Sequence, residues 1–366
     1  MTGRERIEKT LEGRKIDRIP WTTIADEKSR EGMPQEYAQC DYISFYRKIG
    51  CDILAFGKYA MPNEFQPRDP FCYKWRHTQA SYEKNGAMVL ERRLGGNVLT
   101  AAWREGHPVK YPVETRQDAE TLLQIWKVAN VLEEADFEAS CVAADECIGK
   151  DGVFALTLLP SPVQMLIENE CGPENFYYLL QDEPALMDEL MDAMFEKRKI
   201  EYEIAARLAP FRWIIPVENT STTLISPQIY RKYTMPHMAE FARVMHENGK
   251  KAVVHMCGLV KGLLREIRET GIDGIHALTE PPIGDCTFCE ALDALGEQTI
   301  LVGTLQPAVF QSPFAKREDI FRCVKATLTK RIVESNFILC PCIDGLPTPL
   351  WKLQAVRDAV ELYGQK

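Results

Sequence analysis

The chain has 366 residues, enough for two average domains or for one large α/β barrel. Hydrophobic residues make up 45% of it and charged residues 27%, the proportions of an ordinary globular protein. The net charge of -9, without a basic stripe, argues against nucleic acid as a partner, and no stretch approaches the ~20 apolar residues of a membrane span. The first residues are charged and lack the apolar core of a signal peptide, which favours a cytoplasmic location.

Cysteine usage points to a reducing compartment. Twelve cysteines are too sparse for a disulfide scaffold in a chain of this length, so we expect thiols or metal ligands. Most stand alone in helical or mixed surroundings, where a buried, inert thiol is expected: Cys40, Cys51, Cys72, Cys141, Cys147, Cys171 and Cys323.

The first elements form a β-α-β unit. A short amphipathic helix is predicted over residues 3–13, and the first strand over Ile19–Ile24. A helix over Tyr37–Ile49 stops at a glycine and leads into the second strand, Asp52–Phe56.

Residues 58–150 interrupt the alternation and read as an insertion on the scaffold. A hairpin is expected, with strands over 88–94 and 98–103 around Gly95 and Gly96, because glycines suit a tight turn. Two helices are predicted to follow, over 116–132 and 133–148.

From residue 153 apolar strands alternate with helices to the end of the chain. Near-continuous apolar strands of this kind indicate a parallel sheet covered on both faces. Counting the first two, there are eight strands, which predict a single-domain (β/α)8 TIM barrel over residues 1–366, with the insertion between strands 2 and 3. The remaining strands are Val153–Leu159, Arg212–Val217, Lys251–Cys257, Gly274–Leu278, Thr299–Leu305 and Asn336–Cys342; the helices are 162–171 with 183–208, 227–248, 259–270, 287–295 and 315–334.

Polar residues close several of these strands, and a barrel's active site lies at the carboxyl ends of its strands. His255 and Cys257 alternate along the fifth strand and so project to the same side, which supplies half of a tetrahedral zinc site. Sulfur, imidazole and carboxylate ligands suit Zn²⁺ better than Mg²⁺ or Ca²⁺. The other strand-end groups are Glu218 after the fourth strand, His276 and Glu280 at the sixth, and Cys340 and Cys342 at the eighth.

Three further features bear on this site. Glu218 is expected to be an exchangeable fourth zinc ligand, with a hydrogen bond to a neighbour such as His276 as the alternative. Cys286 and Cys289 have zinc-finger spacing but no second pair, so a metal there is the weaker hypothesis. Four apolar side chains near strand ends are candidates for a pocket wall: Trp21, Met61, Met256 and Phe288.

A series of short motifs resembles the uroporphyrinogen decarboxylase superfamily over essentially the whole chain. The motifs are Asp17-Arg-Ile-Pro20, Leu224-Ile-Ser-Pro227, Val254-His-Met-Cys-Gly258, Gly303-Thr-Leu-Gln-Pro307 and Thr348-Pro-Leu350. Within this superfamily, His-x-Cys with a cysteine shortly before Thr-Pro is similar to the zinc methyltransferase branch, and that spacing selects Cys342 over Cys340. The arginine-rich segment and the aspartate pair of true decarboxylases are replaced here by Trp21–Asp26 and Val217-Glu-Asn219, which argues against porphyrinogen decarboxylation.

The resemblance implies Zn²⁺, cobalamin carried by a corrinoid partner protein, and a small-molecule methyl donor. Our leading hypothesis is an O-demethylase component that moves a methyl group from a methoxylated aromatic compound to cobalt. The alternatives are transfer from methylcobalamin to a thiol of the coenzyme M type, and a decarboxylase-like lyase or tetrapyrrole-binding protein without zinc. His276 and Glu280 would protonate or orient the substrate oxygen, and association into a homodimer is left open.

Overall fold

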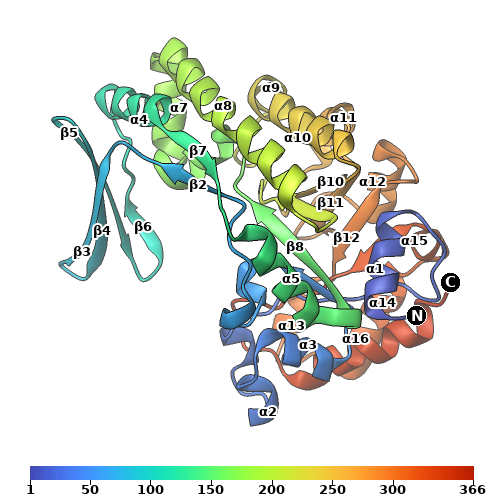
Figure 1. Ribbon diagram of the computed structural model, residues 1–366. Coiled ribbons are helices and arrows are strands. Elements are labelled where there is room, and N and C mark those ends of the chain that lie inside the picture. Colours follow the sequence, from blue (N-terminus) through green and yellow to red (C-terminus); the bar gives the residue numbers. More distant parts are fainter.

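The computed structural model describes residues 1–366, and its centre is a parallel sheet of seven strands. Neighbours in this sheet are all parallel, and the sheet curls into a barrel with helices outside it (Figure 1). The strands in spatial order are β1 (Ile53–Phe56), β8 (Gly152–Leu158), β9 (Trp213–Pro216), β10 (Lys251–His255), β11 (Gly274–Thr279), β12 (Ile300–Thr304) and β13 (Asn336–Leu339).

The eighth position of the barrel is filled by the irregular segment 19–24. Thr22 N–H donates to the carbonyl of Leu339 in β13 (2.8 Å), and the carbonyl of Trp21 accepts from Asp52 N–H beside β1 (2.7 Å). The predicted first strand is therefore present only as isolated bridges, because Pro20 has no N–H to give to a ladder. This segment forms a seam that closes the barrel between its last and first regular strands.

Two apolar cores lie on either side of the barrel wall. Inside the barrel, Leu54, Val153, Trp213 and Val302 pack together with Ile7 of α1. Helix α1 (Gly3–Leu11) begins with a capping box at Thr2 and covers the amino-terminal end of the strands. The larger core fills the space between the strands and the outer helices: α3 (Tyr42–Ile49), α5 (Phe137–Ile148), α8 (Pro184–Leu208), α10 (Met235–Glu247), α11 (Leu264–Glu269), α12 (Phe288–Leu295), α14 (Arg317–Thr327), α15 (Lys330–Glu334) and α16 (Leu350–Tyr363).

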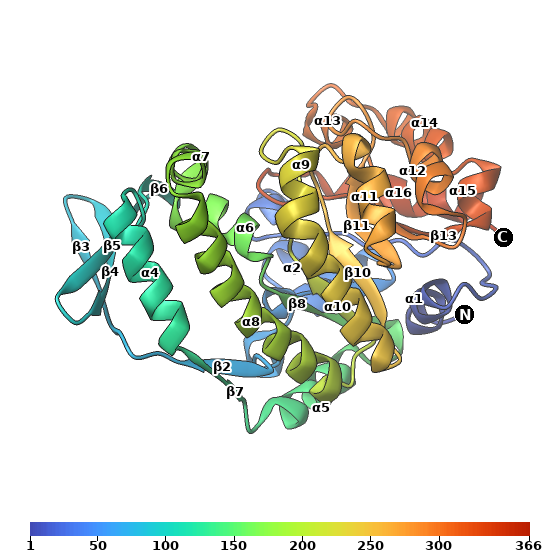
Figure 2. The same cartoon turned by 90° about the horizontal axis from the view of Figure 1, so that it is seen from above.

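The insertion between β1 and β8 adds two antiparallel sheets. The larger one projects from the side of the barrel, next to α4 (Arg116–Val128), as Figure 2 shows. Its attachment includes a partly buried ion pair between Arg92 and Glu170, in which Arg92 Nη1 donates to Glu170 Oε1 (3.1 Å). The strands are β3 (Thr78–Lys84), β4 (Ala87–Leu94), β5 (Asn97–Arg104) and β6 (His107–Lys110), with β2 (Phe71–Lys74) and β7 (Asn130–Glu133) forming the smaller sheet.

The structure corrects several element boundaries. The expected helix over 116–132 ends at Val128, because Asn130–Glu133 pairs with β2, and the next helix begins only at Phe137. The segment 315–334 is two helices, α14 and α15, and the hairpin around Gly95 and Gly96 is confirmed within β4 and β5. Short helices complete the chain: α2 (Gln35–Ala38), α6 (Pro162–Met165), α7 (Gly172–Asp182), α9 (Pro227–Ile229) and α13 (Pro307–Gln311).

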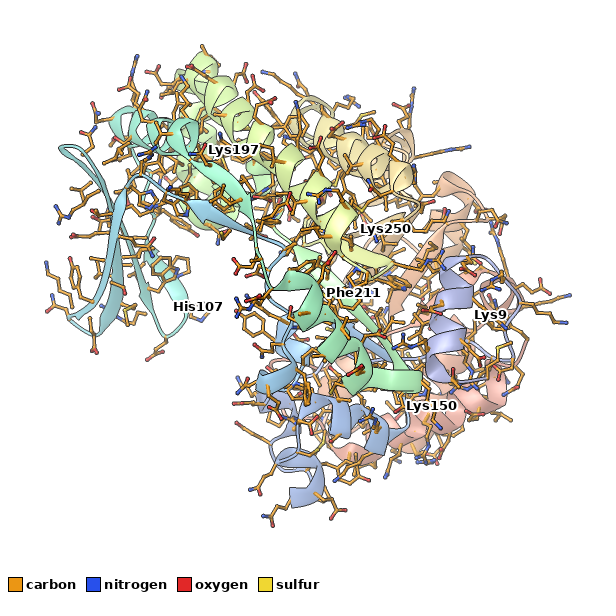
Figure 3. All side chains as sticks on the ribbon, viewed as in Figure 1. Lys9, His107, Lys150, Lys197, Phe211 and Lys250 are labelled. Atoms are coloured by element: carbon orange, nitrogen blue, oxygen red, sulfur yellow. The ribbon has the colours of Figure 1, made fainter.

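The candidate site lies at one of the two ends of the barrel. At the amino-terminal end, Lys250 donates to the carbonyls of Ala209 (2.7 Å) and Phe211 (2.8 Å), and Figure 3 shows Lys250 and Phe211 close together there. The opposite end, which we call the mouth, carries the candidate site. None of the helices is both long and apolar enough to span a bilayer.

Candidate metal centre at the barrel mouth

Two histidines face each other on neighbouring strands. His255 ends β10, His276 lies in β11, and their register pairs them, with 2.8 Å between the two Nδ1 atoms. Phe56 of β1 stacks on both rings, at 4.4 Å from His276 and 5.3 Å from His255 between centroids. Burial lowers the pKa of His255 to about 4 and also lowers the pKa of His276, so both rings are neutral at pH 7. One Nδ1–H therefore donates to the other Nδ1. In the arrangement with His255 as the donor, Nε2 of His255 carries no proton and can bind a metal.

Cys257 lies two residues beyond His255, on the same side of the strand. Its thiol donates to Oδ1 of Asn219 (3.5 Å), and Nδ2 of Asn219 donates to Oε1 of Glu168 (2.9 Å). Partial burial is the main cause that raises the pKa of the Cys257 thiol, and the carboxylates of Glu168 and Asp344 raise it further. Asn219 has a left-handed backbone (φ 48°), a conformation that clusters at functional sites in non-glycine residues.

Cys340 and Cys342 follow β13 and, as alternate residues of the chain, both face the inside of the barrel. Cys340 is 2% exposed and packs in the barrel interior with Val302 and Ile338. Cys342 lies one layer nearer the mouth, where its thiol donates to Oδ1 of Asp344 (2.7 Å). Burial raises the pKa of Cys340 to about 12 and also raises that of Cys342, so both are protonated thiols when no metal is bound.

Glu218 is fully buried directly after β9. Its Oε2 accepts a hydrogen bond from Ser161 N–H (2.7 Å), and its Oε1 accepts one from the Ser161 hydroxyl (2.6 Å). Burial raises the pKa of Glu218 to about 7. The neighbour that holds this carboxyl is thus Ser161, not His276.

Glu280 follows β11, but its side chain turns away from the two histidines. Its Oε1 accepts from the backbone N–H of Phe288 (3.1 Å), at the start of α12. It also lines a surface cavity of about 570 Å³ together with Gln306, Val309 and Cys323. The structure therefore brings His255, His276, Cys257 and Cys342 to the mouth and leaves Glu280 at its outer edge.

The donor set fits zinc in its chemistry. One imidazole nitrogen and two thiols are ligands that Zn²⁺ prefers, and the thiols would lose their protons on binding. In the structure these side chains keep their local partners, and no three His, Cys, Asp or Glu side chains are grouped as a metal site. The Cys286 thiol likewise donates to the carbonyl of Thr287 (3.2 Å).

The prediction that four apolar side chains near strand ends form a pocket wall is wrong. Trp21, Met61, Met256 and Phe288 are at most 2% exposed, and all four belong to the core between the strands and the outer helices. Phe56 is the aromatic side chain that faces the barrel interior near the mouth.

Sequence reasoning missed four polar residues of the mouth. Ser161 and Asn219 lie in the short segments just beyond the ends of β8 (Leu158) and β9 (Pro216), so the strand-end rule could have found them. Asp344 lies two residues beyond Cys342. Glu168 had no sequence signal, because it lies in a π-helical turn, Leu166–Glu170, inside a helical segment.

A closed parallel barrel with imidazole, thiol and carboxyl groups at the carboxyl ends of its strands defines a (β/α)8-barrel protein with its site at the mouth. The uroporphyrinogen decarboxylase (URO-D) family model matches residues 162–363, more than half of the chain, and the chain belongs to this family. Both the predicted barrel and the predicted superfamily are thereby confirmed.

Two relatives are informative. The methylcobamide:CoM methyltransferase MtaA of Methanosarcina barkeri is 26% identical over 144 residues, and the match spans 39% of the length of each protein. A solved methyltransferase from Methanosarcina mazei has the same fold, with a TM-score of 0.59 over 99% of each chain at 14% identity.

Proposed function

We propose that the protein is a zinc-dependent methyltransferase that moves a methyl group from a methoxylated aromatic compound to the cobalt of a corrinoid protein. Membership of the family, together with the His-x-Cys motif and Cys342, supports the methyltransferase branch. The partial match to a methylcobamide:CoM methyltransferase supports a corrinoid partner.

The position of Phe56 is the observation that supports the proposal of an aromatic substrate. Its ring is nearly parallel to that of His276 (7°) and tilted by 27° from that of His255, so Phe56 stacks on one face of the histidine pair, whose own rings are tilted by 34° to each other. Aromatic rings prefer such offset stacking, at about 0.5–1.5 kcal/mol beyond the area they bury. A substrate ring placed against this stack would lie beside His255, the proposed zinc ligand.

His255, Cys257 and Cys342 would hold the zinc. When bound, Zn²⁺ would act as a Lewis acid on the ether oxygen, which makes the phenoxide a better leaving group as cobalt takes the methyl carbon. His276 would orient His255 through the Nδ1–Nδ1 hydrogen bond. Glu280 faces Phe288 N–H and would need to turn toward the mouth to act on the substrate.

The experiment that tests this function is a methyl-donor screen with Co(I) cobalamin and the zinc-loaded protein. Formation of methylcobalamin from a methoxylated arene, read by its absorbance, is the expected result. The zinc-loaded protein giving no methylcobalamin from any such arene would contradict the proposal.

The activity named for the Methanosarcina barkeri relative favours a second candidate, transfer from methylcobalamin to a thiol. The same zinc ligands suit this reaction, since zinc lowers the pKa of a bound thiol. Incubation with free methylcobalamin and a thiol separates the two functions. Rapid thiol-dependent loss of the methyl-cobalt absorbance, without any methoxy compound, would favour this second candidate.

We also propose Glu218 as the exchangeable fourth ligand. Both of its oxygens are held by Ser161, so at least one of these hydrogen bonds would have to open for the carboxylate to reach the metal. A carboxylate is a harder ligand than a thiolate and easier to displace by substrate.

Glu218→Gln should keep zinc content near normal and lower turnover on the order of 10²-fold. Three strong ligands remain, and glutamine still accepts one hydrogen bond from Ser161. Metal analysis and steady-state assays on the same preparation measure both quantities. Unchanged turnover would remove Glu218 from the site.

A further inference from the structure

A β-bulge interrupts β11 immediately after His276. The residues of β11 pair one to one with those of β12 as far as His276, which lies opposite Val302, and again from Leu278, which lies opposite Gly303. Ala277 is therefore an extra residue between two paired positions. It is 7% exposed, and its φ of 67° lies in the left-handed region that residues other than glycine rarely adopt.

The extra residue decides which side chains of β11 face the inside of the barrel. Side chains alternate along a regular strand, so the residue two positions beyond His276 would share its side. In the structure, however, His276 faces inward and stacks on Phe56, whereas Leu278 packs with Ile275 in the core between the strands and the outer helices. Both placements are compatible only because Ala277 shifts the alternation by one residue.

Without the bulge, one part of β11 would have to slip by one residue, which turns its side chains to the opposite face. A slip beyond His276 would project Leu278 into the mouth beside Cys257, since His276 and His255 lie opposite each other in register. A slip before Leu278 would turn His276 outward, and its Nδ1 would lose the contact with Nδ1 of His255 (2.8 Å). Either rearrangement would alter the proposed zinc site.

Hydrogen bonds hold the backbone on both sides of Ala277. The carbonyl of His276 accepts from the N–H of Met256 (2.9 Å), and the carbonyl of Ala277 accepts from the hydroxyl of Thr279 (3.2 Å). A backbone conformation of this kind persists where the surrounding contacts enforce it, and such conformations cluster at functional sites.

We propose that Ala277 is a positioning residue of the metal centre. Its left-handed backbone maintains the bulge, which holds the His276 ring against His255 and keeps Leu278 out of the mouth. The proposal rests on the proposed function, because it concerns the same zinc ligands. Bulges next to active sites commonly change the direction of a side chain in this way.

The test varies the residue at position 277 by how well it tolerates a left-handed backbone. Asparagine and threonine are both polar and nearly equal in size, but asparagine often adopts this conformation, whereas a β-branched residue does so only as an outlier. Ala277→Thr should therefore lose the bulge, and Ala277→Asn should keep it. Circular dichroism checks that both variants retain the barrel fold.

The first readout is the proton shared by the Nδ1 atoms of His255 and His276, observed by NMR in the metal-free protein with isotope-labelled histidine. This N–H is buried and hydrogen-bonded, so we expect a slowly exchanging signal in the parent protein and in Ala277→Asn, and its loss in Ala277→Thr. The second readout is the affinity for zinc, measured by competition with a chelator. Removing a partner that orients a metal ligand lowers the affinity by about 10–100-fold, and we expect a decrease in this range for Ala277→Thr but not for Ala277→Asn.

Ala277→Gly supplies a measurement that stands even if Ala277→Thr does not fold. Glycine adopts positive φ without strain, so the signal of the histidine pair should persist to a temperature at least as high as in the parent protein. Three results would each overturn the proposal: a threonine variant that keeps the histidine signal and the zinc affinity, an asparagine variant that loses both, or a glycine variant whose signal disappears at a lower temperature.

These readouts separate the inference from the proposed function. If Ala277→Thr loses the histidine signal and zinc affinity, but the parent protein methylates no Co(I) cobalamin from any methoxy compound, the positioning role stands and the proposed function fails. If Ala277→Thr keeps both while the parent protein demethylates a methoxylated arene, the proposed function stands and the positioning role fails.

Discussion

Cys342→Ala should abolish zinc retention and lower methyl transfer on the order of 10³-fold, while the barrel stays folded. The substitution removes one of three strong ligands. His255 and Cys257 remain, and these two do not hold zinc firmly, nor does Glu218 take the place of the lost thiolate. The chain has a large apolar core of its own, so the fold should not depend on the metal. Zinc is measured after dialysis, activity with Co(I) cobalamin, and fold by circular dichroism.

Cys340→Ala is the matched control, because it removes the same sulfur one layer deeper in the barrel. Cys340 packs among Val302 and Ile338, so its loss should leave zinc content and activity near those of the parent protein. Loss of zinc in Cys340→Ala with retention in Cys342→Ala would assign the ligand to Cys340 instead.

Arg198→Leu should cost about 3–5 kcal/mol in the free energy of unfolding. Arg198 and Glu201, both in α8, are fully buried, and Nη1 of Arg198 lies 2.5 and 2.6 Å from the two Glu201 oxygens. Its Nε donates to the carbonyl of Pro160 (3.0 Å), next to the serine that holds Glu218. The substitution leaves the buried Glu201 carboxylate with only the Tyr73 hydroxyl as a donor, and it leaves the Pro160 carbonyl without the donor it has here.

Denaturation with urea, followed by circular dichroism, measures this loss. Arg243→Leu is the control, since Arg243 pairs with Glu240 and Glu247 on the exposed face of α10 and should leave the midpoint nearly unchanged. The double variant Arg198→Leu/Glu201→Leu should recover part of the loss, because no buried charge is left unpaired. A loss below about 1 kcal/mol for Arg198→Leu would contradict the expectation.

The regular strands were predictable because each is an apolar run bounded by helix or turn signals. Segment 19–24 was predicted as a strand, but the backbone of Pro20 limits it to isolated bridges. Asn130–Glu133 was assigned to a helix because its partner, β2, lies far away along the chain, and local periodicity carries no information about such pairing. Boundaries failed where tertiary pairing overrode local preference.

The strand-end rule placed His255, Cys257 and Cys342 at the mouth, and the alternation along each strand set the side they face. The strand-end rule does not predict the conformation of the loops that follow the strands. After β11 the chain turns so that Glu280 meets Phe288 N–H at the start of α12, a contact that depends on loop geometry. Glu168 reaches the mouth from a widened helical turn, which has no sequence signature.

The seam has a consequence for the order of events during synthesis. Segment 20–24 is fastened to the strand that leads to Cys342, since Thr23 Oγ1 donates to the carbonyl of Pro341 (2.6 Å) and Ile343 N–H donates to that of Ile24 (3.1 Å). A nascent chain that has emerged only as far as Gly303 already contains His255 and Cys257 but has nothing with which to close the barrel. Capture of zinc by all three proposed ligands would therefore require the segment that carries Cys342 to have joined the strand that carries His255 and Cys257. A chain stalled on the ribosome before Cys342 would bind the metal weakly.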